Sequence, residues 1–493
     1  MSETILTQAP EKILDGVLEN FAKLAAIPRP SKHEEQVSNF LKQFFAEQGL
    51  AVVQDNFKNI IAEVPATVGK ENLPVTILQA HMDMVCVARE GYAFEPTRDP
   101  IKLIRDEKFL SAEGTSLGAD NGVAIAEILY LVQNRNDFSH GRLRIIFTVD
   151  EEAGMIGATN LDEKFLSDAS FMINCDSERF GEIVTGCAGS VHAVFRRELH
   201  YVRPDTKLFT NMIIKVSGLR GGHSGEDISA GRINAIKVVV HIMRQITRYG
   251  KIRMANLSGG KAFNTIPDSA QIFIATDLKV DAVQKICAEV ERRLKIIYSA
   301  TEPNLQIDTQ VVKRPDKVLH AKDYECLANF ITLLHSGAYL MQPEDPTQVI
   351  ASANLSSVRM NDELVEIKVM PRGNVDALVE EFIEGFRQAA QLCMFESRFS
   401  ALIPAWTFNP ESKLSKLATE IFTEQNGYAP KVKIIHAGLE PSFFVKKNPA
   451  LDIISIGTTN EHIHTPNERL HLETVAPHVK FIAGILERMG DSN

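Results

Sequence analysis

Long apolar runs are missing from this sequence, and none approaches the length of a membrane-spanning helix. The N-terminal stretch MSETILTQAPEKILDGVLENF carries acidic residues near its start and no apolar core, so we expect no secretory signal. The six cysteines are scattered without a Cys-x-x-Cys spacing, which favours free thiols in a reducing compartment over a disulfide framework or a cysteine zinc site. These absences predict a soluble, cytoplasmic protein that does not enter a membrane.

Basic clusters interleaved with aromatic residues are also missing, and 63 acidic residues outweigh 53 Lys and Arg. The net charge of -10 argues against nucleic acid as a main partner. The chain has instead the balance of a soluble globular protein, with 44% hydrophobic and 24% charged residues. Its 493 residues exceed one ordinary hydrophobic core, so two or more domains are expected.

Apolar strands that alternate with helices predict an α/β first domain. Helices are expected over residues 11–26 and then up to about residue 49, followed by the strand-like segments NIIAEVPA, VTILQAHMDMV, LRIIFTVDEE and ASFMINCDSE. Between the second and third of these, ADNGVAIAEILYLVQNR has apolar positions at helical spacing. Near-continuous apolar strands are typical of a sheet covered on both faces.

The pattern changes near residue 187 and predicts an inserted domain. Two segments, NMIIKVSGLRGGHSGEDISAGRINAIKVVVHIMRQI and LVEIKVMPRGNVDALVEEFIEGFRQAAQL, each read as a strand, a Gly-containing loop and a helix. We therefore interpret residues 187–401 as one inserted α+β domain, and leave open whether it consists of two related halves. The strand ALDIISIG and a last helix then return the chain to the first domain, which comprises residues 1–186 and 402–493.

The unusual ionisable residues share one location, because almost all of them follow the end of a predicted strand. In open α/β sheets, sites form outside the carboxyl ends of the strands, so these side chains are expected to converge. They are His81 and Asp83, Asp120 at the start of a helix, Glu151 and Glu152, Asp176, and His462 and His464.

This set of imidazoles and carboxylates suits two divalent metal ions, and zinc accepts both His nitrogen and carboxylate oxygen. A carboxylate shared between two ions offsets their mutual repulsion, and Asp120 is the natural bridge. Of the adjacent Glu151 and Glu152, one can bind metal while the other points at the substrate. A carboxylate beside a metal-bound water can take its proton.

Each of these residues taken alone has an interpretation that needs no metal. A His at a strand end is more often a hydrogen-bonded core residue than a ligand. A Glu-Glu pair is usually a solvated face or a helix start, and Asp before Asn-Gly is usually a turn. Together, however, these interpretations require a separate coincidence at each strand end, so the whole set favours a metal site.

The motifs HMDMV, GADNG, DEEAGM, NCDSE, GGHSG, NTIPDSA and HTPNE, in this order, resemble the dizinc peptidases of the aminoacylase and carboxypeptidase G type. Within that family, AHMDMV, GTSLGADNGVA, GLRGGHSGEDI and HAGLE are most similar to the bacterial aminoacyl-histidine (Xaa-His, β-alanyl-histidine) dipeptidases. The resemblance spans about residues 10–490. It implies a mixed sheet sandwiched by helices, with an inserted ferredoxin-like α+β lid domain.

The resemblance also implies roles for the residues of the first domain. Glu151 would be the general base, and Asp83 would orient the imidazole of His81. His462 lies two residues from a proposed ligand, and its part in metal binding is left open. The implied metal ligands are His81 and Asp176 at one ion, Glu152 and His464 at the other, and Asp120 between them.

In the lid, His223 of RGGHSG is implied to polarise the scissile carbonyl and stabilise the developing oxyanion. Without the resemblance it would read equally well as part of a Gly-rich turn. Asn264 and Arg372 would hold the terminal carboxylate of the substrate, although Arg372 alone would read as a surface ion pair. Gly438, Leu439 and Glu440 would lie near the N-terminal side of the substrate.

Three departures from the family pattern bear on substrate choice. Pro441-Ser442 follows GLE where Cys-Gly is expected, and Gly373 follows the lid arginine where Ser is common. Phe263 precedes Asn264 where a basic residue is common. Every proposed metal-site position keeps its residue type, so these departures favour a diverged specificity over a loss of catalysis.

The sequence therefore predicts a dizinc dipeptidase that hydrolyses short, unblocked peptides, with Xaa-His and carnosine-like dipeptides favoured. Two divalent ions are expected, zinc in the first place, with cobalt or manganese able to substitute. The alternatives are a deacylase or carboxypeptidase acting on N-acyl amino acids, and a metal-dependent binding protein without turnover. The small peptide is the expected partner. A homodimer through the lid, with His223 serving its own or the partner's site, is left open.

Overall fold

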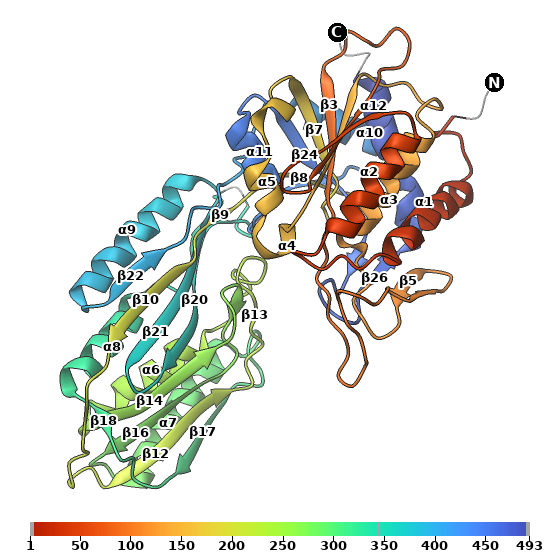
Figure 1. The fold of residues 1–493 in the computed structure, drawn as a ribbon. Helices are drawn as coiled ribbons and strands as arrows, with labels where there is room; N and C mark the ends of the chain where they lie inside the picture. Colours follow the sequence, from red (N-terminus) through yellow and green to blue (C-terminus); the bar gives the residue numbers. More distant parts are fainter. Residues whose placement is uncertain (1–3, 344, 490–493) are drawn as a thin grey trace. The chain divides into compact units, whose positions relative to one another are not determined.

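The computed structural model describes residues 4–343 and 345–489, and the chain divides into two compact units (Figure 1). Unit 1 consists of Met1–Gly186, Phe408–Ile434 and Leu439–Asn493, and unit 2 of Cys187–Thr407 and Ile435–Gly438. The outer ends of the predicted first domain, residues 1–3 and 490–493, lie outside the described residues. Each unit has its own hydrophobic core.

The second unit ends later than the sequence suggested, and it takes up a short segment from further along the chain. Residues beyond 401 still pair with the start of unit 2, because Ile403 bridges to Ser190 and Trp406 to Cys187. The backbone N–H of Ala188 donates to the carbonyl oxygens of Ile435 and Ala437, each at 3.1 Å. These backbone hydrogen bonds, which leave no mark in the hydrophobic pattern, explain the difference.

Unit 1 is built on an eight-stranded sheet. Its order is β1 (Ala51–Gln54), β2 (Ile60–Val64), β6 (Leu143–Thr148), β3 (Val75–His81), β7 (Ala169–Asn174), β24 (Asp452–Ser455), β8 (Glu182–Cys187) and β23 (Lys431–Ile435). The four central strands β6, β3, β7 and β24 are parallel, whereas β1–β2, β2–β6 and β24–β8 pair antiparallel. The expected mixed sheet is therefore confirmed.

Helices pack against this sheet, α2 on β1 and β2, α3 on β3 and α10 on β24. The helices of unit 1 are α1 (Pro10–Ala25), α2 (Glu35–Glu47), α3 (Ala119–Gln133), α4 (Glu151–Gly154), α5 (Ile156–Asn160), α10 (Lys413–Asn426), α11 (Pro441–Lys447) and α12 (Val475–Arg488). The helix α3 contacts α1, α12 and the strand β3. It is buried on all sides from Val123 to Val132, which explains why its sequence is apolar almost throughout.

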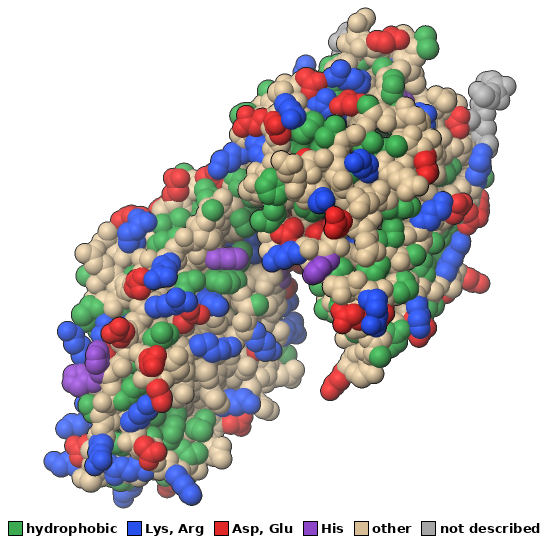
Figure 2. Space-filling view, in the orientation of Figure 1, with side chains coloured by type: hydrophobic (Ala, Val, Ile, Leu, Met, Phe, Trp, Pro, Cys, Tyr) green, Lys and Arg blue, Asp and Glu red, His purple; other side chains and the backbone are tan. Residues whose placement is uncertain are grey.

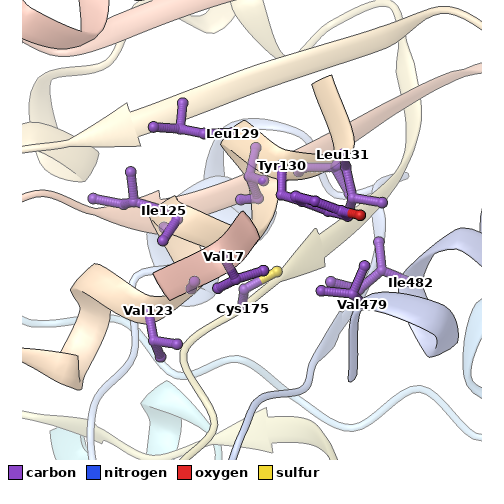
Figure 3. Close-up of a cluster of buried hydrophobic side chains, with 14 of the residues drawn as sticks. Val17, Val123, Ile125, Leu129, Tyr130, Leu131, Cys175, Val479 and Ile482 are labelled. Carbon is purple, nitrogen blue, oxygen red and sulfur yellow. The ribbon is translucent and has the colours of Figure 1, made fainter. Parts of the chain in front are cut away.

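The core around α3 joins segments from both ends of the chain. In Figure 3, Val17 of α1 and Val479 and Ile482 of α12 gather with side chains of α3, among them Leu131. A second, four-stranded sheet of unit 1 has the order β25 (Asn460–Glu461), β26 (Arg469–His471), β5 (Phe109–Ala112) and β4 (Leu103–Arg105). The loop that carries His462 and His464 connects β25 to β26, so these two paired strands fix where that loop begins and ends.

Unit 2 is built on an antiparallel sheet with helices, as expected for an α+β domain. Its order is β17 (Gln306–Val311), β12 (Thr210–Ser217), β16 (Ala270–Thr276), β14 (Ile252–Gly260), β20 (Val349–Met360), β21 (Leu364–Gly373), β10 (Ala193–Glu198) and β22 (Glu396–Phe399). The strands β19 (Gly337–Met341) and β9 (Gly189–Ser190) pair with β20 and β21. The helices are α6 (Ala235–Ile246), α7 (Val280–Ile297), α8 (Ala321–Leu333) and α9 (Asp376–Leu392).

The two strand–loop–helix segments of the sequence are β12 followed by α6, and β21 followed by α9. Between β12 and α6 lies a small ribbon of β13 (Gly222–His223), which pairs with β15 (Thr265–Ile266). A further two-stranded pair joins β11 (Tyr201–Val202) to β18 (Val318–Leu319).

The surface carries charged side chains of both signs, and the thiols of the described residues form no disulfides. On the visible faces in Figure 2, Lys and Arg side chains are interspersed with Asp and Glu. All six cysteines are free. In the part of the chain that the structure describes, no helix is both long and apolar enough to cross a bilayer.

Candidate metal centre

The carboxyl ends of the parallel strands bring the polar residues of unit 1 together. His81 is the last residue of β3, Glu151 and Glu152 follow β6, and Asp176 follows β7. Asp120 opens α3, which packs on β3. Because parallel strands end at the same edge of a sheet, side chains placed just after them converge there.

Asp120 lies at the centre of this cluster. Its Oδ1 is 3.1 Å from His81 Nε2, and its Oδ2 is 3.1 Å from His464 Nε2. His81 Nε2 is also 3.3 Å from Asp176 Oδ1, and His464 Nε2 is 2.7 Å from Glu152 Oε1. The two oxygens of one carboxylate thus face two separate sets of candidate metal ligands, an arrangement that suits two ions with one bridging ligand.

The donor atoms are close enough to share ions. Three groups have all their ligand atoms within 4.8 Å of one another: His81, Asp120 and Asp176; His81, Glu151 and Glu152; and Asp120, Glu152 and His464. Neither Asp83 nor His462 belongs to such a group among the described residues. Imidazole nitrogen and carboxylate oxygen form the donor set that zinc and neighbouring divalent metals accept.

The electrostatics of the cluster also fit bound cations. Burial, and next to it the charge of Asp120, raises the pKa of Glu152 to about 7. Burial raises the pKa of Glu151 well above its usual value, and the carboxylates of Asp176 and Glu152 add to the effect. So many buried carboxylates oppose one another's ionisation, and divalent cations between them would remove this penalty.

Asp83 supports the cluster from behind. Its Oδ1 is 3.4 Å from His81 Nδ1 and accepts the backbone N–H of Glu151 at 2.9 Å. Its Oδ2 accepts the backbone N–H of Glu152 at 3.1 Å and the hydroxyl of Ser31 at 2.7 Å. Burial would raise the pKa of Asp83, but His81 and these hydrogen bonds lower it, so the carboxylate stays ionised. One side chain therefore contacts both His81 and the Glu-Glu pair.

Glu440 lies inside unit 1. It is fully buried, and its Oε2 accepts hydrogen bonds from Gln79 Nε2 and Thr148 Oγ1, each at 2.6 Å. Burial raises its pKa to about 7. These contacts anchor the start of α11 to the ends of β3 and β6, and its expected place beside the substrate stays a prediction.

In unit 2, the ribbon β13–β15 places His223 and Asn264 side by side. The backbone carbonyl of Asn264 accepts the N–H of Ser224 at 2.8 Å, and His223 pairs with Thr265. His223 Nδ1 accepts the backbone N–H groups of Gly225 and Glu226, each at 3.3 Å. Because Nδ1 is an acceptor, the ring proton of neutral His223 is on Nε2, where it can donate.

Arg372, which alone would suggest a surface ion pair, is buried in β21 opposite Ser352 of β20. Burial lowers the pKa of its guanidinium to about 10. Its Nε has no hydrogen-bond partner among the described residues, and an Nη donates to the sulfur of Met370, at 3.5 Å. A buried cation with an unfilled donor is costly, and an anionic group of a ligand would compensate it. Gly438 ends the short segment that joins this unit.

The sequence alone did not single out several residues that the structure makes functional candidates. His436 contacts Ser352 and Asn374 in unit 2, although its motif HAGLE drew attention only for the residues after it. Two further residues contact the loop that leads into Asp120 in unit 1. They are Glu468, at the end of HTPNE, and Arg29, in the Pro-rich break IPRPS. The motif contained a signal for Glu468, whereas nothing in the sequence distinguishes Arg29.

Two relatives match nearly the whole chain. The cytosol non-specific dipeptidase of Escherichia coli is 33% identical over 472 residues, which cover 95% of this chain and 96% of the relative. The crystal structure of aminoacylhistidine dipeptidase from Vibrio alginolyticus superposes with a TM-score of 0.85 at 29% identity, covering 96% of each chain. These matches support the resemblance seen in the motifs.

A third comparison extends the fold to eukaryotes. The dipeptidase Dug1p of Saccharomyces cerevisiae has a TM-score of 0.55 at 13% identity over the full length of both chains, which shows a shared fold. The model of peptidase family M20/M25/M40 matches residues 77–488. With the donor cluster at its strand ends, this chain is a metal-dependent peptidase and belongs to peptidase family M20/M25/M40.

Proposed function

We propose that this protein is a dipeptidase that hydrolyses short, unblocked peptides, with Xaa-His and carnosine-like dipeptides favoured. The observation that carries the proposal is Asp120, whose two carboxylate oxygens each lie 3.1 Å from a different histidine. The full-length similarity to two proteins named as dipeptidases supports it. The name of one of them, aminoacylhistidine dipeptidase, supports the Xaa-His preference.

The metal ions would be held by five side chains of unit 1. His81 and Asp176 would bind the first ion, Glu152 and His464 the second, and Asp120 both. Zinc suits this set of nitrogen and oxygen donors, and cobalt or manganese can substitute for it. When bound, such ions supply Lewis acidity and lower the pKa of water.

Glu151 would act as the general base. It accepts the proton of the attacking water and delivers it to the amine that leaves. Its raised pKa suits both tasks, because a base that gives up its proton again needs a pKa near the working pH. Glu151 also belongs to a donor group with His81 and Glu152, so a ligand role is the competing assignment.

Unit 2 would serve as the lid of the enzyme and unit 1 as its catalytic domain. In the lid, the Nε2–H of His223 would donate to the oxygen of the scissile carbonyl. Arg372 would bind the terminal carboxylate of the substrate, with Asn264 beside it, because the Nε of its buried guanidinium has no hydrogen-bond partner among the described residues. Gly438 and Glu440 would flank the N-terminal side.

We also propose that the protein is a cytoplasmic homodimer that forms through unit 2. The strand β19 pairs on one side with β20 and, among the described strands, with no other. Next to it lies a hollow of about 440 Å³, whose lining includes the apolar side chains of Tyr339 and Phe382 and the carboxylates of Glu381 and Glu384. Tyr339 is 56% exposed, so a second copy would cover both an open strand edge and an apolar surface. Sedimentation of a Tyr339→Lys variant, expected to be monomeric, tests the dimer.

A hydrolysis panel on metal-stripped protein, reloaded with zinc, cobalt or manganese, tests the activity. Its substrates are β-Ala-His, Gly-His, other dipeptides, tripeptides and N-acetyl amino acids. Fastest turnover of β-Ala-His and Gly-His is expected. Preference for N-acetyl amino acids would instead indicate a deacylase, and no turnover with any metal would indicate a binding protein.

A further inference from the structure

Two buried charges of opposite sign hold the backbone loop that leads into Asp120. Arg29 and Glu468 are only 2% and 3% exposed, and both bind Gly118, two residues before Asp120. A guanidinium N–H of Arg29 donates to the carbonyl oxygen of Gly118, and Glu468 Oε2 accepts the N–H of the same residue at 3.0 Å. The cation and the anion therefore bind the two polar groups of one residue.

Arg29 connects this loop to the segment that carries the first histidine. Besides Gly118, its guanidinium donates to the carbonyl oxygens of Met82 at 2.9 Å and of Asp83 at 3.1 Å. These residues directly follow His81. A single side chain from the Pro-rich break thus ties the end of β3 to the start of α3.

Glu468 connects the same loop to the segment that carries the second histidine. Its carboxylate accepts four backbone N–H groups, from Leu117, Gly118, Ala119 and Asp120, at 2.8, 3.0, 2.8 and 3.4 Å. These hydrogen bonds compensate its buried charge. The backbone N–H of Glu468 donates to the carbonyl of Thr465, the residue after His464.

We propose that Arg29 and Glu468 are positioning residues that hold the Asp120 carboxylate in its bridging orientation between His81 and His464. Neither side chain belongs to the donor groups of the metal site, so they act through the backbone of the loop. The Asp120 carboxylate reaches both histidines, each at 3.1 Å, only where the backbone of this loop places it between them. The two charges together link three segments that each carry a proposed ligand.

The shape of the loop shows how tightly it is held. Gly118 has a φ of +70°, and a Cβ at this position would lie 2.5 Å from the sulfur of Met84 and 2.7 Å from a guanidinium nitrogen of Arg29. Glycine is therefore required both for the left-handed backbone and for the close approach of Arg29. A larger residue would displace the guanidinium that fixes the loop.

The test is the affinity of the folded protein for zinc, measured by competition with a chromogenic chelator. Glu468→Gln keeps the volume of the side chain but turns an N–H donor toward the backbone N–H groups. Arg29→Lys keeps the charge but cannot reach three carbonyls at once. Each variant is expected to raise the zinc dissociation constant roughly 10- to 100-fold, as removal of groups that orient metal ligands typically does. The visible absorption of the cobalt-loaded variants should change as well.

Two matched variants serve as controls. Arg144 is a buried arginine of unit 1 that donates to the carbonyl of Phe165, and Glu302 is a buried carboxylate of unit 2 that accepts two backbone N–H groups. Arg144→Lys and Glu302→Gln should leave the zinc affinity and the cobalt spectrum unchanged.

The metal-free variants could unfold at a lower temperature while their zinc affinity and cobalt spectrum stay as in the parent protein. That result would show a merely structural role and overturn the proposal. If Glu468→Gln does not fold, Glu468→Asp, which keeps the charge but shortens its reach, is measured in its place. The inference rests on the proposed metal site. A parent protein that binds no zinc would refute that site, whereas unaffected variants of a zinc-binding parent refute only the positioning role.

Discussion

Asp83 Oδ1 accepts the backbone N–H of Glu151 at 2.9 Å. The same oxygen lies 3.4 Å from His81 Nδ1, so the carboxylate contacts a proposed ligand and the backbone of the proposed base at once. The usual interpretation of an acidic residue behind a metal-binding histidine is that it orients the ring. Here it also fixes where the Glu-Glu pair begins.

Replacing Asp83 with Asn should therefore impair two parts of the site. The amide has one acceptor oxygen where the carboxylate has two, so either Glu151 or Glu152 loses its backbone hydrogen bond. Metal affinity and kcat are each expected to fall roughly 10- to 100-fold. Chelator competition and steady-state hydrolysis of a dipeptide measure them.

Asp55→Asn is the matched control for this variant. Asp55 is also a carboxylate of unit 1 that accepts two backbone N–H groups, both at Oδ1, from Phe57 and Asn59, each at 2.9 Å. It lies outside the donor groups, so its loss should leave kcat and metal affinity unchanged. An Asp83→Asn enzyme that behaves like this control would contradict the double role.

Glu151→Gln distinguishes a base from a ligand at this position. If Glu151 is the base, the variant keeps two metal ions per chain, and kcat falls roughly 100- to 10,000-fold because proton transfer is lost. If Glu151 is a ligand, the metal content falls together with the activity. Elemental analysis of the purified variant, beside its kinetics, separates the two, and full activity would refute both roles.

The clustering of the candidate metal ligands could be predicted from the sequence because it depends on a regular feature of the fold. His81, Glu152 and Asp176 each follow an apolar run, and parallel strands end at one edge of a sheet. The structure brings their ligand atoms together with those of Asp120 and His464. The mixed sheet and the inserted α+β unit were predictable for a similar reason, because the hydrophobic pattern of a segment indicates how it packs into the layers of a domain.

Contacts that depend on tertiary packing could not be predicted in this way. Arg29 lies in a Pro-rich break, and only the packed structure shows that it is buried against Gly118. The same holds for the domain boundary, because the hydrogen bonds of Ala188 to residues 435 and 437 join segments far apart in the sequence. Burial also makes Arg372, a surface residue by its local sequence, a candidate for carboxylate binding.

Arg372→Met tests that binding. Methionine fills a similar volume without the charge, so the buried cation is removed and the fold should not be weakened. A charge-assisted hydrogen bond to a carboxylate contributes about 1.5 to 3 kcal/mol, which predicts a fall in kcat/KM of roughly 10- to 150-fold for a free dipeptide. The fall should come mainly from KM.

The matched control for Arg372→Met is a second substrate and not a second variant. A dipeptide with an amidated C-terminus has no carboxylate to bind, so the variant and the parent enzyme should cleave it at rates within about twofold, below the effect of one hydrogen bond. Equal losses on the free and the amidated dipeptide would indicate that Arg372 supports the fold of unit 2 and does not bind the carboxylate.

His436 is held in its neutral form within unit 2. The amide nitrogen of Asn374 donates to the carbonyl of Val349, so the amide oxygen of Asn374 faces His436 Nδ1, at 3.3 Å, and accepts a hydrogen bond from the Nδ1–H. His436 Nε2 is then the acceptor for the hydroxyl of Ser352, at 2.8 Å. Burial, together with the charge of Arg372, lowers the pKa of His436 to about 3.

The lowered pKa of His436 predicts how the stability of unit 2 depends on pH. Between the folded pKa of about 3 and the unfolded value of 6.5, only the unfolded chain takes up the proton at His436. The free energy of unfolding of unit 2 should therefore fall as the pH drops below 6.5, and His436 should contribute about 1.4 kcal/mol per pH unit to the slope. His436→Gln, which does not titrate, should show a slope smaller by that amount. Urea unfolding followed by the fluorescence of Trp406, the single tryptophan and part of unit 2, measures it, and equal slopes would contradict a neutral buried His436.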